Sequence, residues 1–261
     1  MIDIEQIYNE YLTDKSNKNR QERYADNEKW YHASNAGRCY KIHWYSTRGT
    51  TQDVPSLKQN RIFEMGNIIH ESFQKALIFK FGDKVFNEQE ITIPRLNVRG
   101  FIDSVLPEFF LEQLGITATL IYDIKSMNSF SWKFKYGLVK NRKAQSGLAE
   151  IQLGTYALGL SESKSSNVLL PFNVVEPIIM NLVNYKKDDS QLKIELAQRK
   201  CMIQAEQYWE EAKLFMQQHT MKEPMPVTTV GCPRLSWECN YCSYAGTCNS
   251  PLYKKSTGDD N

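Results

Sequence analysis

Two neighbouring strands that end in charged residues most constrain how this 261-residue chain can fold. Residues 98–106 and 117–125 are rich in apolar and β-branched residues, which predicts a strand in each. The first carries Asp103, and the second closes on Asp123 and Lys125. Because Asp123 and Lys125 are two residues apart, their side chains point to the same face of a strand. Two carboxylates can hold Mg²⁺ through oxygen ligands, and the ammonium can orient a water or offset charge on a phosphate.

An Asp-x-Lys tripeptide is common, and alone it favours a simpler interpretation, an exposed strand end with an ordinary ion pair. Its surroundings favour a functional site. His70 lies on a predicted helix that precedes the strands, and Asp103 lies three residues after Gly100 in its strand. Gln152 and Tyr156 are four residues apart, so they share one face of the following helix and can project into the same cleft.

The hydrophobic pattern of the whole chain predicts an α/β protein with a sheet that is part hairpin-connected and part crossover. Residues 1–30 are polar and predict a helix with a mobile segment around residues 14–20, and Ser34 or Asn35 could cap a short helix carrying Cys39. Asp188–Ser190 can cap a long final helix that reaches His219. Its apolar stripe comprises Ile194, Cys201, Ala205, Tyr208, Ala212 and Phe215. The other predicted elements are helices at 58–80 and 145–160, strands at 85–93, 98–106 and 117–125, and an extended segment at 174–185.

Four short motifs, taken in order, resemble the PD-(D/E)XK nuclease superfamily and specifically its RecB-like branch. The matching stretches are Gly66–His70, Gly100–Asp103, Asp123–Lys125 and Gln152–Tyr156, within roughly residues 57–160. The family often has a glutamate at the position of Asp123. The resemblance implies a restriction-endonuclease-like core, with a mixed central sheet flanked by helices. It also implies a metal-dependent deoxyribonuclease, an exonuclease rather than an endonuclease, that acts on single-stranded DNA in recombination, repair or CRISPR/phage DNA processing.

The resemblance also implies a role for each residue. Mg²⁺ or Mn²⁺ would be held by His70, Asp103, Asp123 and the backbone carbonyl of Ile124. Lys125 would position or activate the attacking water, and Gln152 and Tyr156 would contact the DNA strand near the scissile phosphate. This chemistry suits the reaction, because phosphodiester hydrolysis builds charge on the phosphate oxygens that a metal and an ammonium offset. The simpler alternatives are a hydrogen-bonded structural histidine and a Gln/Tyr pair at the border of the core.

Six cysteines without a secretory signal favour metal or cofactor binding over a disulfide framework. Cys239, Cys242 and Cys248 lie close together in a Tyr- and Gly-rich loop, which is a strong signal for a metal or cluster. The fourth ligand has three candidates: Cys201 on an apolar helix stripe, the local Cys232, and Cys39 far upstream.

Iron–sulfur members of the RecB-like branch place one cysteine before the core and three after it, as do CRISPR-associated RecB-like exonucleases and AddB-type nuclease domains. This resemblance implies a [4Fe–4S] cluster on Cys39, Cys239, Cys242 and Cys248, which would join the N- and C-terminal segments. Ligand spacing alone does not fix the metal, and Cys232 keeps Zn²⁺ as the alternative. The implied division is an N-terminal segment 1–56, a nuclease core 57–221, a cysteine-rich segment 222–253 and a disordered tail 254–261.

Residues 130–143 mix aromatic and basic side chains and contain no acid. Basic residues supply phosphate contacts, and interleaved aromatics can stack on unpaired bases. The segment therefore has two interpretations, a surface that guides a DNA strand or a solvated loop with a few packed aromatics. This patch consists of Phe130, Trp132, Lys133, Phe134, Lys135, Tyr136, Lys140, Arg142 and Lys143.

The predicted partner is DNA, preferably single-stranded, with helicase, recombination or CRISPR proteins as further partners, because no P-loop is present. The net charge of +2 decides little about nucleic-acid binding. No apolar run approaches the roughly 18 residues that span a membrane, and Met1–Glu5 lacks a signal core, so a cytoplasmic location is expected, in a host cell if a phage encodes the chain. Two alternatives are a zinc-stabilised, non-catalytic nucleic-acid-binding module and an adaptor subunit of a CRISPR adaptation complex.

Overall fold

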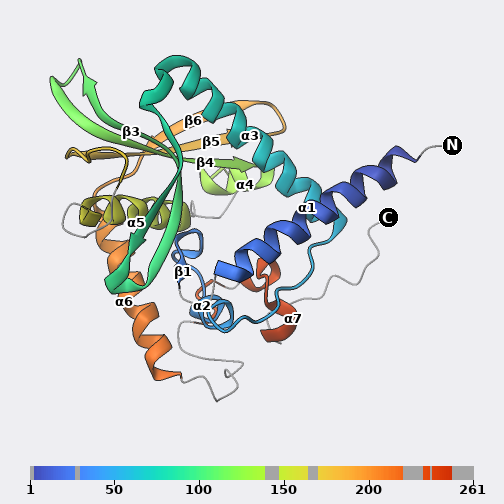
Figure 1. The fold of residues 1–261 in the computed structure, drawn as a ribbon. Coiled ribbons are helices and arrows are strands. Elements are labelled where there is room, and N and C mark those ends of the chain that lie inside the picture. Colours follow the sequence, from blue (N-terminus) through green and yellow to red (C-terminus); the bar gives the residue numbers. More distant parts are fainter. Residues whose placement is uncertain are drawn as a thin grey trace.

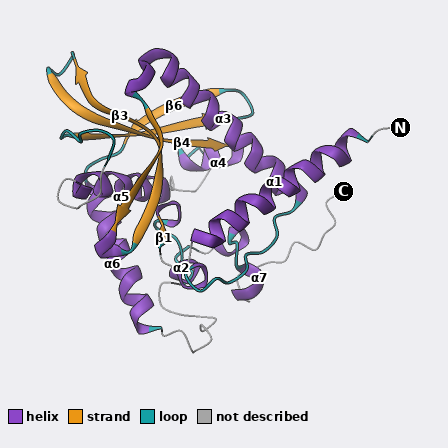
Figure 2. Cartoon of the chain, in the orientation of Figure 1, coloured by secondary structure: helices purple, strands orange, loops and turns teal. Residues whose placement is uncertain are grey.

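The computed structural model describes residues 3–26, 30–138, 147–163, 170–219, 232–235 and 237–248. A six-stranded mixed sheet forms the centre, and helices cover both of its faces (Figure 1; Figure 2). The strands are β1 (Tyr31–His32), β2 (Phe86–Ile93), β3 (Val98–Leu111), β4 (Ile116–Met127), β5 (Ile178–Lys186) and β6 (Gln191–Leu196). The helices are α1 (Ile4–Asp26), α2 (Tyr40–Ser46), α3 (Leu57–Phe81), α4 (Ser129–Lys135), α5 (Leu148–Ser163), α6 (Lys200–Gln218) and α7 (Ala245–Cys248).

Strand β3 organises the sheet because it has partners along both edges. One edge pairs antiparallel with β2, from Val98 to Val105. The opposite edge pairs with β1 at Val98 and Arg99 and with β4 from Ser104 onward. Beyond β4, the order continues with β5, which is parallel to β4, and with β6, which is antiparallel to β5. The parallel β4–β5 pair requires a crossover connection, and α5 lies within it.

Helix α3 covers one face of the sheet. It begins at a capping box in which Ser56 and Gln59 exchange side-chain and backbone hydrogen bonds. Its buried side packs against apolar residues of β3, β4 and β5, whose side chains alternate between the two faces. The helix residues in these contacts are Ile69, Phe73, Leu77 and Phe81.

Helices α5 and α6 cover the other face, where the larger core lies. Leu153, Ala157 and Leu160 of α5 belong to one buried cluster with apolar residues of all of β2 to β5. Helix α6 packs on α5 at Gly154, where an added Cβ would lie 2.2 Å from the Cys201 carbonyl oxygen. Only glycine permits this approach of the two backbones.

The segments before and after the sheet lie against each other. The Asp53 amide donates to the Ser243 carbonyl oxygen (2.7 Å), and the Asp53 carboxylate accepts from the Gly246 amide (2.9 Å). The rings of Tyr45 and Tyr244 stack with 5.4 Å between their centres. The chain therefore brings α2 and α7 together, although most of the sequence separates them (Figure 1).

Most predicted elements are confirmed. The helix expected at 58–80 is α3, the strands expected at 85–93 and 98–106 are β2 and β3, and Cys201 is buried on α6. The helix expected at 145–160 is α5, which is described from Leu148 onward. Strands β3 and β4 run further toward their shared turn than predicted, and the extended segment 174–185 becomes β5 from Ile178.

Three predictions about local structure were wrong. The final helix does not start after residue 190, because residues 191–196 form β6 and place Ile194 on an edge strand with 57% exposure. Residues 14–20 belong to the continuous helix α1, which packs on α3 through ion pairs such as Lys15–Glu64 at 2.7 Å. Helix α2 begins after Cys39, which is its N-cap residue, rather than at a cap on residue 34 or 35. The predicted tail 254–261 lies outside the described residues. Among the residues that the structure does describe, no helix is long and apolar enough to cross a bilayer.

Two helix glycines offer a matched test of the α5–α6 contact. Gly154→Ala is expected to lower the free energy of unfolding by roughly 1–3 kcal/mol, because the new methyl group overlaps the α6 backbone. Gly66→Ala is expected to raise it by roughly 0.5–1 kcal/mol, because its Cβ would meet only Ser126 Oγ at 3.6 Å. Urea denaturation of both variants measures the two changes, and equal changes would contradict the packing described here.

Candidate active site

The candidate site lies at a gap in the sheet. On the β4 side of β3, pairing with β1 stops at Arg99 and pairing with β4 starts at Ser104. Between them lies the stretch Gly100–Asp103, which faces no strand of the described residues on this edge. Side chains from the two covering layers meet in this gap, His70 from α3 and Gln152 from α5.

Asp103 replaces the missing strand partner on one side of the gap. Its Oδ2 accepts a hydrogen bond from the Ile124 amide at 2.6 Å and lies 3.5 Å from His70 Nδ1. The His70 ring also hydrogen-bonds the Ile124 backbone. Burial, together with the nearby Asp123 carboxylate, raises the pKa of Asp103 to about 8. Burial and then the Lys125 ammonium lower the pKa of His70.

Asp123 is at the centre of a second hydrogen-bond network, on the α5 side. Its Oδ1 accepts from Lys125 Nζ at 2.9 Å and from Gln152 Nε2 at 3.3 Å. Gln152 Oε1 accepts from the same ammonium at 3.2 Å. Burial alone would lower the pKa of Lys125, but the carboxylates of Asp123 and Asp103 outweigh it, so the pKa is raised. The lysine therefore keeps its proton at neutral pH.

Tyr156 completes this network. Its hydroxyl lies 2.6 Å from Gln152 Nε2, which donates to it. The ring reaches the gap because position 100 is a glycine. A Cβ there would lie 2.9 Å from the Tyr156 ring and 2.4 Å from the Ala33 side chain. The glycine of the Gly100–Asp103 motif thus makes room for the tyrosine of the Gln152–Tyr156 motif.

The donors in the gap suit a hard divalent cation. Asp123 Oδ2 is buried and has no hydrogen-bond partner, although a buried carboxylate oxygen normally has one. Carboxylate and carbonyl oxygens with one imidazole match the preferences of Mg²⁺ and Mn²⁺. Within the described ranges, however, no three His, Cys, Asp or Glu side chains form a ready-made ligand set. Mg²⁺ usually keeps several waters, so it needs only one or two of these carboxylates.

Glu88 is a site neighbour that the sequence analysis missed. Gln74 Nε2 donates both to Glu88 Oε1 (2.7 Å) and to the Asp103 carbonyl oxygen (3.0 Å). The hairpin register could have found it, since pairing Ile93 with Val98 places Glu88 opposite Asp103. Glu90, on the same strand, forms an ion pair with Arg99 at 2.7 Å.

The five cysteines other than Cys201 gather where the N- and C-terminal segments meet. The Cys39 and Cys232 thiols hydrogen-bond to each other. Cys242 lies near Cys239 and Cys248, and burial raises its pKa to about 11. Tyr45 of α2 hydrogen-bonds Cys248, which links the two groups.

The aromatic and basic patch forms α4, directly after β4. Phe130 is 65% exposed and stacks on Phe134 with 6.2 Å between ring centres. Trp132 is buried and packs on Tyr136, while Lys135 is engaged by Glu195 at 3.0 Å. Lys140, Arg142 and Lys143 lie outside the described residues.

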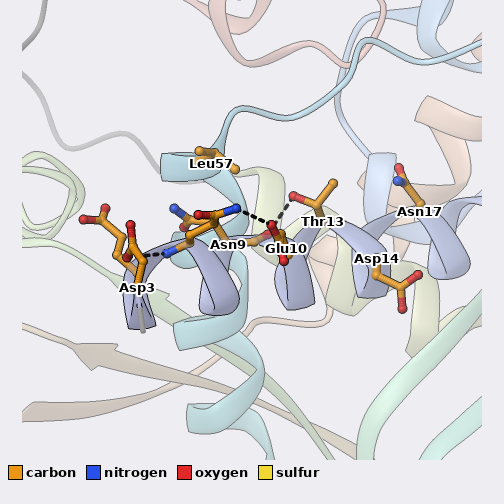
Figure 3. Close-up of a pocket in the computed structure, with 9 residues that line it drawn as sticks. Asp3, Asn9, Glu10, Thr13, Asp14, Asn17 and Leu57 are labelled. Atoms are coloured by element: carbon orange, nitrogen blue, oxygen red, sulfur yellow. Dashed lines mark hydrogen bonds between the residues drawn. The ribbon is translucent and has the colours of Figure 1, made fainter. Parts of the chain in front are cut away.

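A cavity of about 620 Å³ lies elsewhere, along α1 and the start of α3 (Figure 3). Its lining is polar and acidic and includes none of the predicted site residues. The lining residues are Asp3, Glu5, Gln6, Asn9, Glu10, Thr13, Asp14, Asn17 and Leu57.

Comparisons with known proteins support the fold alone. No family model matches the chain, and no curated protein matches it. The chain is similar to the crystal structure of SSO0001, with a TM-score of 0.51 and 16% identity over 92% of this chain and 96% of that chain. It is also similar to a protein from Eubacterium rectale named "Putative exonuclease", with a TM-score of 0.42 and 11% identity over 80% and 95% of the two chains. A score of 0.42 is too low to support an argument.

The raised pKa of Asp103 predicts a pH-dependent cost to folding in EDTA. An unfolded aspartate ionises near pH 3.8 and the folded one near pH 8, so this cost grows as pH rises through that window and is fully present above it. Asp103→Asn is therefore expected to stabilise the protein more at pH 8 than at pH 5, by on the order of 2 kcal/mol. Urea denaturation at both pH values measures this, with Glu90→Gln as the control. Equal gains at the two pH values would contradict the assignment.

Proposed function

We propose that this chain is a metal-dependent deoxyribonuclease that hydrolyses phosphodiester bonds, with single-stranded DNA ends as its substrate. The observation that carries the proposal is the meeting of Asp103, Asp123 and Lys125 at the sheet gap, where Asp123 Oδ2 has no partner. A structural ion pair would satisfy that oxygen. A cation-binding carboxylate would keep it free for the metal.

His70, Asp103, Asp123 and the Ile124 carbonyl would hold the Mg²⁺ or Mn²⁺, which when bound polarises the phosphate and lowers the pKa of a coordinated water. The backbone of Ile124 already contacts both His70 and Asp103, which keeps these groups near one another. The raised pKa of Asp103 fits a group that gives up its proton when a cation arrives.

Lys125 acts as a charged group and not as a base. Its raised pKa keeps it protonated, and its side chain is 31% exposed, so it can reach a substrate from the sheet gap. In this role the ammonium orients the attacking water and offsets the charge that develops on the phosphate oxygens.

Gln152 and Tyr156 serve this site by positioning. They are only 9% and 3% exposed, which leaves little surface for direct contact with a DNA strand. Their hydrogen bonds instead fix the orientation of Asp123 and Lys125. The DNA contact that the family resemblance implies for both residues stays the alternative prediction.

The surface of α4 suits an unpaired DNA strand. The exposed Phe130 ring stacks on Phe134 and can also stack on a base. The exposed Lys133 can contact a phosphate. The helix follows Lys125 by only a few residues, so a strand bound there would lead toward the sheet gap.

A [4Fe–4S] cluster on Cys39, Cys239, Cys242 and Cys248 completes the proposal. The packing of α2 against the segment 237–248 supports this, because it places Cys39 in the same part of the fold as the other three cysteines, although no three of these described thiols already form a ligand set. Cys232 lies beside Cys39, so a zinc site that includes Cys232 is the competing assignment.

The proposed chemistry predicts activity on labelled single-stranded DNA in Mg²⁺ or Mn²⁺. Asp123→Asn and Lys125→Met are each expected to slow cleavage by roughly 10²–10³-fold, because each removes charge stabilisation from the transition state. Gel analysis of 5′- and 3′-labelled strands measures the rate and the polarity together.

Glu90→Gln is the matched control, because it neutralises an acid on β2 that forms an ion pair with Arg99. Its rate should equal that of the unmodified protein. Cleavage unchanged by Asp123→Asn and Lys125→Met would refute the catalytic assignment. If the protein binds DNA but does not cut it, it is a nucleic-acid-binding module. If it neither binds nor cuts DNA but copurifies with a nuclease, it is an adaptor subunit.

The cluster assignment predicts a coloured protein after anaerobic purification, with about four iron atoms per chain. Cys39→Ser should remove the colour and most of the iron, whereas Cys201→Ser should keep both, because Cys201 lies on α6 at its contact with Gly154 of α5. Visible absorption with iron and zinc assays gives the answer. If the protein is colourless and contains stoichiometric zinc, and the Cys39→Ser variant still contains that zinc, the site is a zinc site that includes Cys232 in place of Cys39.

A further inference from the structure

Strand β6 ends the sheet with an exposed, partly apolar edge. It is the last strand in the order, and within the described residues no strand pairs with its outer side. Its sequence, Gln191–Leu196, alternates polar and apolar residues, so its apolar side chains share one face. These side chains are between 51% and 70% exposed, and they are Leu192, Ile194 and Leu196. An exposed apolar edge strand is a template for pairing with another chain.

The ladder between β5 and β6 determines which backbone groups of β6 point outward. The Ala197 amide, directly after β6, donates to the Met180 carbonyl oxygen at 2.9 Å. Because backbone groups alternate in direction along an antiparallel ladder, the odd-numbered residues of β6 direct their amides and carbonyls toward β5. The even-numbered residues direct theirs to the outer edge, where an added strand would meet them. They are Leu192, Ile194 and Leu196.

This outer edge is complementary to a second copy of itself. When two β6 strands pair antiparallel about a two-fold axis through Ile194, the two Ile194 side chains meet at the axis. Lys193 of each copy then lies opposite Glu195 of the other, and Leu192 lies opposite Leu196. The Lys193–Glu195 pairs occupy non-hydrogen-bonded positions, where opposite side chains are closest. One strand therefore supplies both halves of the interface, as a two-fold dimer requires.

The two charges select this register over its neighbours. The strands can slide only by two residues at a time, because outward-facing backbone groups must stay opposite one another. One such step would set Lys193 against Lys193, and a step the other way would set Glu195 against Glu195. Like charges directly opposite are destabilising, whereas the register centred on Ile194 makes two pairs of opposite charge.

Both charges remain accessible within the single chain. Lys193 Nζ lies 3.8 Å from the centre of the Tyr136 ring and 4.0 Å from Glu195 Oε1, at the outer limit of an ion pair. Glu195 Oε2 contacts Lys135 Nζ at 3.0 Å and Asn184 Nδ2 at 2.9 Å. The Lys193 and Glu195 side chains are nevertheless 51% and 32% exposed, so each can reach a partner strand.

We propose that this protein forms a two-fold dimer in solution through antiparallel pairing of β6 with β6 of a second copy. The pairing joins the two sheets into one and gives the outward-facing backbone groups of β6 hydrogen-bond partners. The inference rests on the edge strand alone and does not require the nuclease assignment.

The first test is the mass of the full-length chain by sedimentation velocity. At high micromolar concentration the unmodified protein should have twice the 30.3 kDa mass of one chain, and dilution should return it to 30.3 kDa.

Charge reversal tests the register. Lys193→Glu and Glu195→Lys should each give a monomer, because each variant sets like charges against each other in its own dimer. An equimolar mixture of the two variants should restore the dimer, because every facing pair is then opposite in charge. Lys58→Glu is the matched control, since it makes the same change of charge at an exposed position on α3 and should leave the dimer intact.

Hydrogen exchange locates the interface in the unmodified chain. The outward amides of Leu192, Ile194 and Leu196 should take up deuterium more slowly at high concentration than after dilution, because the partner strand binds them only in the dimer. Exchange in α6 should not depend on concentration. This measurement decides the question even where a charge variant does not fold.

Four results would overturn the proposal. The first is a chain that stays at 30.3 kDa at high concentration. The second is a dimer whose β6 amides exchange equally fast at both concentrations, because its interface would lie elsewhere. The third is a dimer that survives both charge reversals. The fourth is a monomeric mixture of Lys193→Glu and Glu195→Lys variants whose circular dichroism matches that of the unmodified chain.

Discussion

The separation of β4 from β3 is the constraint on which the candidate site depends. Where the two strands part after Ser104 and Tyr122, the Ile124 amide loses the strand that would otherwise accept its hydrogen bond. A buried amide without a partner would be costly, and the Asp103 carboxylate takes that place. The hydrogen bond to the Ile124 amide also directs the Asp103 side chain toward Asp123 and His70. The local defect in the sheet and the grouping of the site residues thus have one cause.

Much of this arrangement could be predicted from the sequence, because its signals are local. Strand β4 shows as a β-branched run, and the spacing of Gln152 and Tyr156 fixes their shared helix face. The order of the motifs then indicates that they meet. Their hydrogen bonds and the free Asp123 oxygen depend on atomic positions that no spacing specifies.

The errors also have physical reasons. Asp188–Ser190 looked like a helix cap, but Asp189 pairs with Lys186 at 2.6 Å and Ser190 has a left-handed φ of 57°, so the segment is a hairpin turn. The strand that follows alternates polar and apolar residues from Gln191 to Leu196, a pattern typical of an edge strand. To predict that Glu88 lies beside the site, one needs the pairing register of the whole β2–β3 hairpin. The contact of Cys39 with Cys232 joins distant parts of the chain, which no local sequence pattern connects.

The packing of α2 against the segment 237–248 has a consequence for how the protein is made. During synthesis, Tyr45 and Asp53 emerge long before Tyr244 and Gly246, their respective contacts in the finished fold. The sheet can form first, but this part of the core keeps apolar surface exposed until residues 237–248 have left the ribosome. Contacts of such high sequence separation form slowly, so the nascent chain keeps the α2 side of this interface accessible for a prolonged period.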